Sequence, residues 1–178
     1  MGGIFCSGNE NLIGGPNPGE GNLANAMGIS GLTSFGDHNT FQGNFTGTDV
    51  TGTGAVPNER GFYIESGIDA LVGGPSRGMR NLISGNSYTG VSTKGNNGII
   101  GTVLQGNFIG VGIDGATHLC NGYPQAITGP ADASSEPTLI GNVEGSCLIP
   151  AIRSRLLHPM LAGLRRFGRI VSRGLNSL

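Results

Sequence analysis

Short apolar segments separated by glycine and asparagine recur along most of this chain. Typical segments are three to five residues long and include residues 11–13, 40–42, 62–64 and 103–105. Runs of this length, bounded by turn-forming residues, predict β-strands whose alternate side chains point inward. Glycine and asparagine suit the corners because both tolerate left-handed backbone conformations. The pattern therefore predicts an all-β chain of short strands joined by tight corners.

The segments belong to an imperfect long repeat, with a period of about 60 residues, of the kind that marks repeat architectures. Leu12 and Leu71 begin similar runs, and the Gln-Gly-Asn-Phe run at Gln42 returns at Gln105. A fixed period of this kind is the sequence signature of a solenoid, in which each unit buries its apolar face against the next.

A shorter step is visible within the long repeat. Gly-Asn pairs place asparagines at positions 22, 44, 86 and 107, and the middle gap is about twice as long as the other two. This spacing predicts coils of about 21 residues, each rising by the strand spacing of about 4.8 Å. In such coils Asn22, Asn44, Asn86 and Asn107 would stack at one corner and pass amide hydrogen bonds from coil to coil.

Charge divides the chain into two segments. Residues 1–152 carry four basic and 11 acidic side chains, a net charge of −7, whereas residues 153–178 carry six arginines and no acidic residue. From residue 148 the apolar residues also change to three- and four-residue steps, which predicts an amphipathic helix. We therefore expect a β-helix domain over residues 1–147 and a basic helical tail over residues 148–178.

Three interpretations of the basic tail stay open. It caps the exposed end of the solenoid, whose strands otherwise present unpaired edges. Alternatively, it touches a membrane surface or another anionic partner. The third interpretation is a non-native tail from a truncated parent gene. The tail is too charged to span a bilayer.

Three cysteines, Cys6, Cys120 and Cys147, form no metal-ligand spacing. An odd count argues against a disulfide framework, although one pair is compatible with the sequence. The chain starts without a recognisable signal peptide, and its first residues already follow the repeat, so we expect a fragment of a larger protein.

The motifs resemble a known class of repeat protein. Gly-Asn-x-Ile-Ser-Gly-Asn, Gln-Gly-Asn-x-Ile-Gly and the Gly-Thr-Asp-x-Thr-Gly-Thr run at residues 47–53 are similar to those of bacterial right-handed parallel β-helix repeat proteins of the pectin-lyase-like superfamily. The resemblance covers residues 9–142 and weakens at residues 110–117. It implies a right-handed parallel β-helix, an extracellular or cell-surface location, and a polysaccharide or cell-surface matrix as partner.

Candidate chemistry is sparse. A lyase or epimerase acting on polysaccharides needs a base together with a cation that neutralises the sugar carboxylate. The polar groups available for such a site are Asp37, His38, Asp49, Arg60, Asp114 and His118. We select Asp49 and Asp114 as the candidate polar site, although both stand in turn sequences where an aspartate commonly caps its own loop. No metal-binding spacing, phosphate loop or cofactor motif is present, and no acidic cluster marks a Ca²⁺ site.

These observations favour a non-enzymatic structural or adhesion module that displays a polar surface to a glycan. The alternative is a fragment of a carbohydrate-active enzyme of the lyase or epimerase type. Nothing in the sequence predicts nucleic-acid binding, a cofactor or an oligomeric state.

Overall fold

The computed structural model describes residues 2–93, 99–123, 127–128 and 137–145, and its strands form three parallel sheets. Sheet A contains β1 (Ile4–Ser7), β4 (Ser30–Phe35), β7 (Arg60–Ser66), β10 (Thr89–Thr93) and β13 (Ile127–Thr128). Sheet B contains β2 (Leu12–Gly14), β5 (Thr40–Gln42), β8 (Leu71–Gly73), β11 (Val103–Gln105) and β14 (Thr138–Ile140). Sheet C contains β3 (Leu23–Ala24), β6 (Phe45–Thr46), β9 (Leu82–Ile83), β12 (Phe108–Ile109) and β15 (Val143–Glu144). One 3₁₀ turn, η1 (Arg77–Met79), interrupts the connection between β8 and β9.

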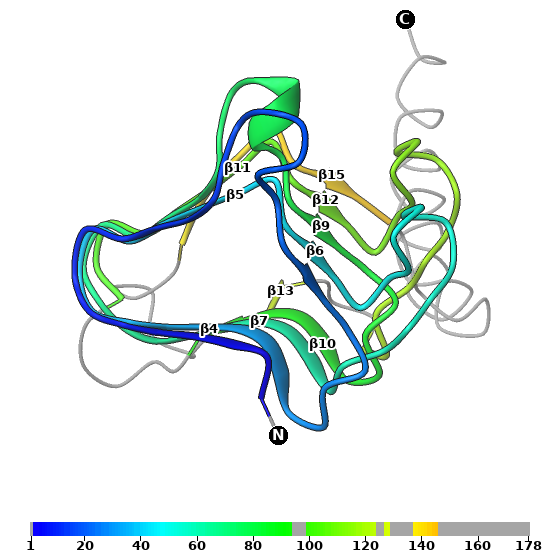
Figure 1. The fold of residues 1–178 in the computed structure, drawn as a ribbon, viewed down its shortest axis with the longest axis horizontal. Helices are drawn as coiled ribbons and strands as arrows, with labels where there is room; N and C mark the ends of the chain where they lie inside the picture. The colour runs from blue at the N-terminus through cyan, green and yellow to red at the C-terminus, as the bar shows by residue number, and fades with distance from the viewer. Residues whose placement is uncertain (1, 94–98, 124–126, 129–136, 146–178) are drawn as a thin grey trace, which may run out of the picture. The chain divides into compact units, whose positions relative to one another are not determined.

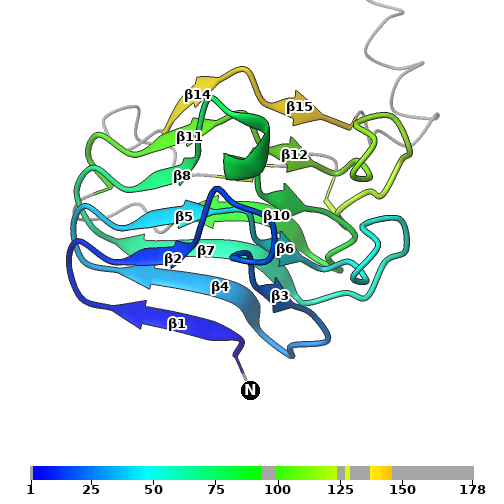
Figure 2. The ribbon, with the colours of Figure 1, turned by 45° about the horizontal axis from the view of Figure 1, so that its top comes forward.

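The chain visits sheets A, B and C in turn and then returns to sheet A. Viewed along the axis, the three sheets form the sides of a triangle (Figure 1), and successive strands stack along each side (Figure 2). The path runs clockwise as it recedes from the N-terminal end, which makes the solenoid right-handed, as expected for parallel crossovers. The all-β parallel β-helix predicted from the short apolar segments is confirmed.

Aligned rows of apolar side chains fill the interior. On sheet B, Ile13, Phe41, Val72 and Leu104 occupy equivalent positions on successive strands. Phe41 meets Phe62 of sheet A edge to face at a centroid distance of 4.7 Å, and both rings are fully buried. Each coil alone is too small to enclose such a core, so stacking against its neighbours supplies the burial.

The short, uniform coil length predicted from the asparagine spacing is wrong. At the corner between sheets B and C, asparagines that face each other across successive coils are separated in the sequence by 22, 37, 26 and 35 residues. Only the first of these steps is close to the predicted length. At the corner between sheets A and B, the step from Asn11 to Asn39 is 28 residues. The coils differ because the connections between strands differ strongly in length.

Long and short connections alternate from one coil to the next. Between sheets B and C a long connection (15–22), a short one (43–44), a long one (74–81) and a short one (106–107) follow in order. Between sheets C and A the order is reversed, with short (25–29), long (47–59), short (84–88) and long (110–126) connections. The last coil departs from this alternation, because only the short segment 141–142 joins β14 to β15. The long repeat seen in the sequence is therefore a pair of coils.

The contacts divide the chain into two units, Met1–Cys147 and Leu148–Leu178. The predicted basic tail, with Cys147 and Lys94, lies outside the described residues. Within the described ranges, no helix has the length and hydropathy required to cross a bilayer.

Candidate functional site

Stacked asparagines fix the corner between sheets B and C. The carboxamide oxygen of Asn44 accepts hydrogen bonds from the backbone N–H (3.1 Å) and the side-chain amide (2.9 Å) of Asn22. The same double contact joins Asn44 to Asn81, Asn81 to Asn107, and Asn107 to Asn142. The remaining amide hydrogen of Asn44, Asn81, Asn107 and Asn142 reaches a backbone carbonyl on the sheet B strand of the preceding coil, as from Asn81 to Phe41. This B–C ladder satisfies buried polar groups that would otherwise lack partners.

Asn86 belongs to a different ladder. Its amide accepts from Asn58 and donates to Asn121, at the corner between sheets C and A. Asn22, Asn44 and Asn107 thus lie in one ladder, while Asn86 lies in another. The short step taken from the sequence combined two corners into one series, and this is the physical reason for the wrong coil length.

Sheet C carries apolar side chains on both faces. Ala24, Ile83 and Ile109 point into the core, and the alternate residues form an outward row. This outward row consists of Leu23, Phe45, Leu82, Phe108 and Val143. Leu82, Phe108 and Val111 form a second apolar cluster, against which Phe45 and Val143 pack. An outward apolar row on a solenoid requires a cover, and the long connections supply most of it.

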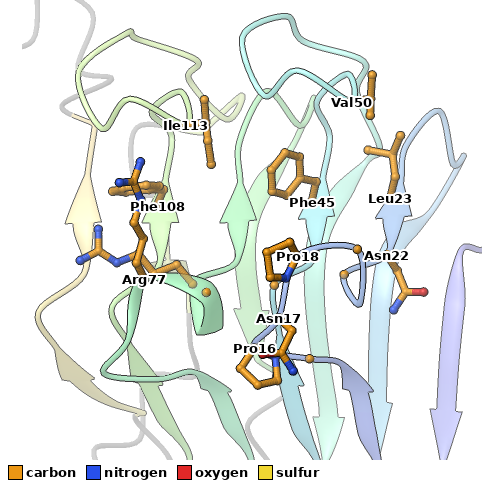
Figure 3. Close-up of a pocket in the computed structure, with 16 residues that line it drawn as sticks. Pro16, Asn17, Pro18, Asn22, Leu23, Phe45, Val50, Arg77, Phe108 and Ile113 are labelled. Atoms are coloured by element: carbon orange, nitrogen blue, oxygen red, sulfur yellow. The ribbon is translucent and has the colours of Figure 1, made fainter.

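Two pairs of long loops stand on either side of the outward row. The proline loops, residues 15–21 and 74–80, join sheets B and C and contain Pro16, Pro18 and Pro75. The aspartate loops, residues 47–56 and 110–119, leave sheet C toward sheet A and are each closed by an antiparallel bridge. Between the two pairs the outer face of sheet C forms a trough of about 460 Å³ (Figure 3).

Apolar side chains line most of the trough. In Figure 3, Val50 lies next to Leu23 at one end of the trough, and Ile113 lies between Phe45 and Phe108 in this view. Val50 is 76% exposed, Leu23 45% and Ile113 39%. Open apolar surface of this kind, enclosed on two sides, is typical of ligand sites rather than of ordinary solvent-facing strands.

Two arginines provide the cationic part of the trough. The guanidinium carbon of Arg80 lies 5.1 Å from the centre of the Phe108 ring, a cation–π distance. The Arg80 Nε atom is buried and has no hydrogen-bond partner, and Arg77 is exposed on η1. In the part of the chain that the structure describes, neither arginine forms an ion pair. The exposed guanidinium group of Arg77 is therefore open to an acceptor that enters the trough, whereas the buried Nε atom of Arg80 is not.

Asp49 and Asp114 point into their own loops. The Oδ1 atom of Asp49 accepts from the backbone N–H (3.1 Å) and hydroxyl (2.7 Å) of Thr51 and from the N–H of Thr53. Asp114 accepts in the same way from Ala116 and Thr117. The hydroxyl of Thr117 and the two backbone donors lower the pKa of Asp114 from 3.8 to about 2, and the Thr51 hydroxyl lowers the pKa of Asp49. Both carboxylates cap loops, and neither lines the trough.

The other polar residues considered from the sequence lie elsewhere. Asp37 accepts from the backbone of Ile68, and His38 stands 3.6 Å from Asp69 at the exposed corner between sheets A and B. Arg60 pairs with Glu59, and His118 belongs to an antiparallel bridge with Val111. No three metal-ligating side chains gather among the residues described.

The cysteines differ in state. Cys120 is disulfide-bonded, whereas Cys6 is a buried free thiol whose pKa is raised by that burial.

The trough was not predicted from the sequence, because Phe45 and Phe108 occur there only as members of the repeated Gln-Gly-Asn-Phe motif. A signal was present in the consecutive apolar pairs Leu82-Ile83 and Phe108-Ile109. Two adjacent apolar residues in a very short strand indicate a strand that is covered on both faces.

Comparison with known proteins adds no identification. No family model matches the chain, and no curated protein and no solved structure matches it significantly.

Proposed function

We propose that this chain is a non-enzymatic binding module that holds a glycan in the trough over sheet C. The observation that supports this proposal is a trough lined by three exposed apolar side chains, Leu23, Val50 and Ile113, combined with two arginines that have no acidic partner among the described residues. A rigid solenoid presents such a surface with little conformational cost, because its backbone is fixed by ladders of hydrogen bonds.

The chemistry of the lining suits a sugar. The apolar face of a pyranose ring packs against aromatic and aliphatic side chains such as Phe45 and Val50. Sugar hydroxyl and carboxylate oxygens accept hydrogen bonds from guanidinium groups, and each arginine offers five N–H donors in a planar arrangement. Asn17, which lines the trough, donates from its backbone N–H and its side-chain amide to Glu20 within the same loop.

A lyase or epimerase is less well supported by the geometry. Such an enzyme needs a base beside the sugar proton that is removed. The described residues that line the trough include no Asp, Glu or His. The carboxylates of Asp49 and Asp114 already accept several hydrogen bonds from their own loops.

The proposal extends to the setting of the protein. The resemblance of the repeat to bacterial pectin-lyase-like proteins supports a role within a larger exported or cell-surface protein, with polysaccharide or matrix as the partner.

The test is a glycan array followed by calorimetric titration of the glycans that bind. Val50→Asp places a charge in the trough, and we expect it to weaken binding about tenfold or more. Ile29→Asp is the matched control, because Ile29 is also well exposed (50%) and does not line the trough. Equal affinity of both variants and the parent chain would exclude the trough as the site. Release of reducing or unsaturated ends from acidic polysaccharides would replace the binding function with an enzymatic one.

A further inference from the structure

The trough consists of two similar halves. Phe45 and Phe108 stand at the same position of sheet C, on strands two coils apart. The lining residues Val50 and Ile113, one on each aspartate loop, have the same separation along the sequence as the two phenylalanines. The phenylalanine on sheet C and the aliphatic residue on the aspartate loop therefore repeat together, once in every two coils.

Each aspartate loop also approaches one of the two aromatic rings. A Cβ atom added to Gly52 would lie 3.3 Å from the Phe45 ring, and one added to Gly115 would lie 3.2 Å from the Phe108 ring. Both glycines have a positive φ, of 69° and 72°. Each aspartate loop thus approaches one ring, but the surroundings differ: the Gly52 position also lies 2.8 Å from Leu82 and 2.9 Å from Ile113, whereas the atoms nearest the Gly115 position all belong to the Phe108 ring.

One complete coil separates the two halves. Leu82 stands between Phe45 and Phe108 on sheet C and is fully buried. Two coils at a strand spacing of about 4.8 Å give a separation of about 10 Å along the solenoid axis. The trough therefore presents two similar half-sites with this period.

We infer that the ligand is an unbranched, extended glycan that lies parallel to the solenoid axis, with alternate sugar rings in the two half-sites. The inference rests on the proposed glycan-binding function and adds the shape and direction of the ligand. In an extended β-1,4-linked chain successive rings are turned over, so the same ring face returns at every second sugar. The length of that disaccharide unit is close to the two-coil spacing of the trough.

The two half-sites are not identical, and the difference gives the bound chain a direction. Gly21 and Arg80 occupy equivalent positions, each immediately before an asparagine of the B–C ladder. Arg80 covers the Phe108 ring, whereas Gly21 adds no side chain beside Phe45. One half-site is therefore mainly apolar and the other is cationic. A glycan has two different ends, so this asymmetry favours one orientation.

A polyproline II peptide is the competing occupant, because it repeats about every 9.3 Å and binds aromatic grooves. The hydrogen-bond donors of the trough favour a glycan over this peptide. Arg77 and Arg80 bring many N–H groups to one half-site. Every ring of a glycan offers several oxygen acceptors, whereas a proline-rich strand offers one backbone carbonyl per residue.

The experiment is calorimetric titration with β-1,4-linked oligosaccharides of two to six sugars, namely the cello- and chito-series. A trisaccharide is the shortest chain with two rings in the same orientation. We therefore expect affinity to rise about tenfold or more between two and four sugars and then to level off, since a second linked contact adds to the first. Curved α-1,4-linked malto-oligosaccharides of equal length should show no such rise.

Variants separate this inference from the proposed function. Val50→Asp and Ile113→Asp each disable one half-site, so each should abolish the rise with chain length while weak binding persists. Ile29→Asp should leave the rise intact. Affinity that does not depend on chain length would overturn the inference and leave the glycan-binding function standing. Failure of every glycan to bind would overturn both, and tighter binding of a proline-rich peptide would assign the trough to that ligand.

Discussion

Removal of one buried asparagine tests whether the B–C ladder holds the solenoid together. Asn81 is 1% exposed, and its side chain takes part in four hydrogen bonds. In Asn81→Ala the backbone N–H of Asn44 and the carbonyl of Phe41 lose their partners from this side chain. Leaving a buried polar group unpaired costs about 1–3 kcal/mol, so two such groups give an expected loss of about 2–6 kcal/mol. This is a large fraction of the total stability of about 5–15 kcal/mol of a typical domain.

The matched control stands at the end of the same ladder. Asn22 is partly exposed, and its side chain makes one ladder contact, to the Oδ1 atom of Asn44. That oxygen keeps the backbone N–H of Asn22 as a donor after truncation. Asn22→Ala should therefore cost about 1 kcal/mol or less. The measurement is urea unfolding followed by circular dichroism, with the denaturant slope checked for constancy. Equal losses in the two variants would refute the idea that burial of the ladder determines its contribution.

Three further predictions concern backbone conformation and charge. Gly61→Ala should destabilise the fold by about 2 kcal/mol or more in a thermal or urea melt, because its Cβ would lie 2.6 Å from Asn86 Nδ2. Gly2→Ala, with nothing within 4 Å, is the neutral control. Ala26→Gly should raise stability by about 0.5–1 kcal/mol, since Ala26 has a φ of 55°; an unchanged melting temperature would contradict this. The folded pKa of Asp114, about 2, lies below its ordinary value of 3.8, so its stabilisation is present above pH 4 and is lost toward pH 2. Acid titration of Asp114→Asn should therefore show a smaller decline in stability over that range than the parent chain.

The architecture could be predicted from the sequence because its signal is local. Short apolar runs bounded by Gly and Asn specify strands and corners without reference to distant residues. Coil length is different, because it depends on which corners align in space. Asn44 and Asn86 look equivalent in the sequence, yet they belong to different ladders. The alternation of long and short connections conceals the single coil and leaves only the pair visible as a repeat.

The candidate site was harder to predict for a related reason. Asp49 and Asp114 stand out in the sequence as charged residues in matching turns of the repeat, but their hydrogen bonds turn them inward. Phe45 and Phe108 resemble core residues, because period-two patterning does not say which face of a strand is covered by loops. The trough exists only where loops from separate coils meet, and such meetings are a property of the assembled solenoid.

The alternation of loop lengths also limits how this protein can grow. Tandem duplication of a single coil that carries a proline loop would set two proline loops side by side and place a short turn where the opposite wall needs an aspartate loop. Duplication of a pair of coils keeps both walls in phase and lengthens the trough by a fixed increment of about 10 Å. The solenoid can therefore be lengthened, by evolution or by design, only in whole pairs of coils.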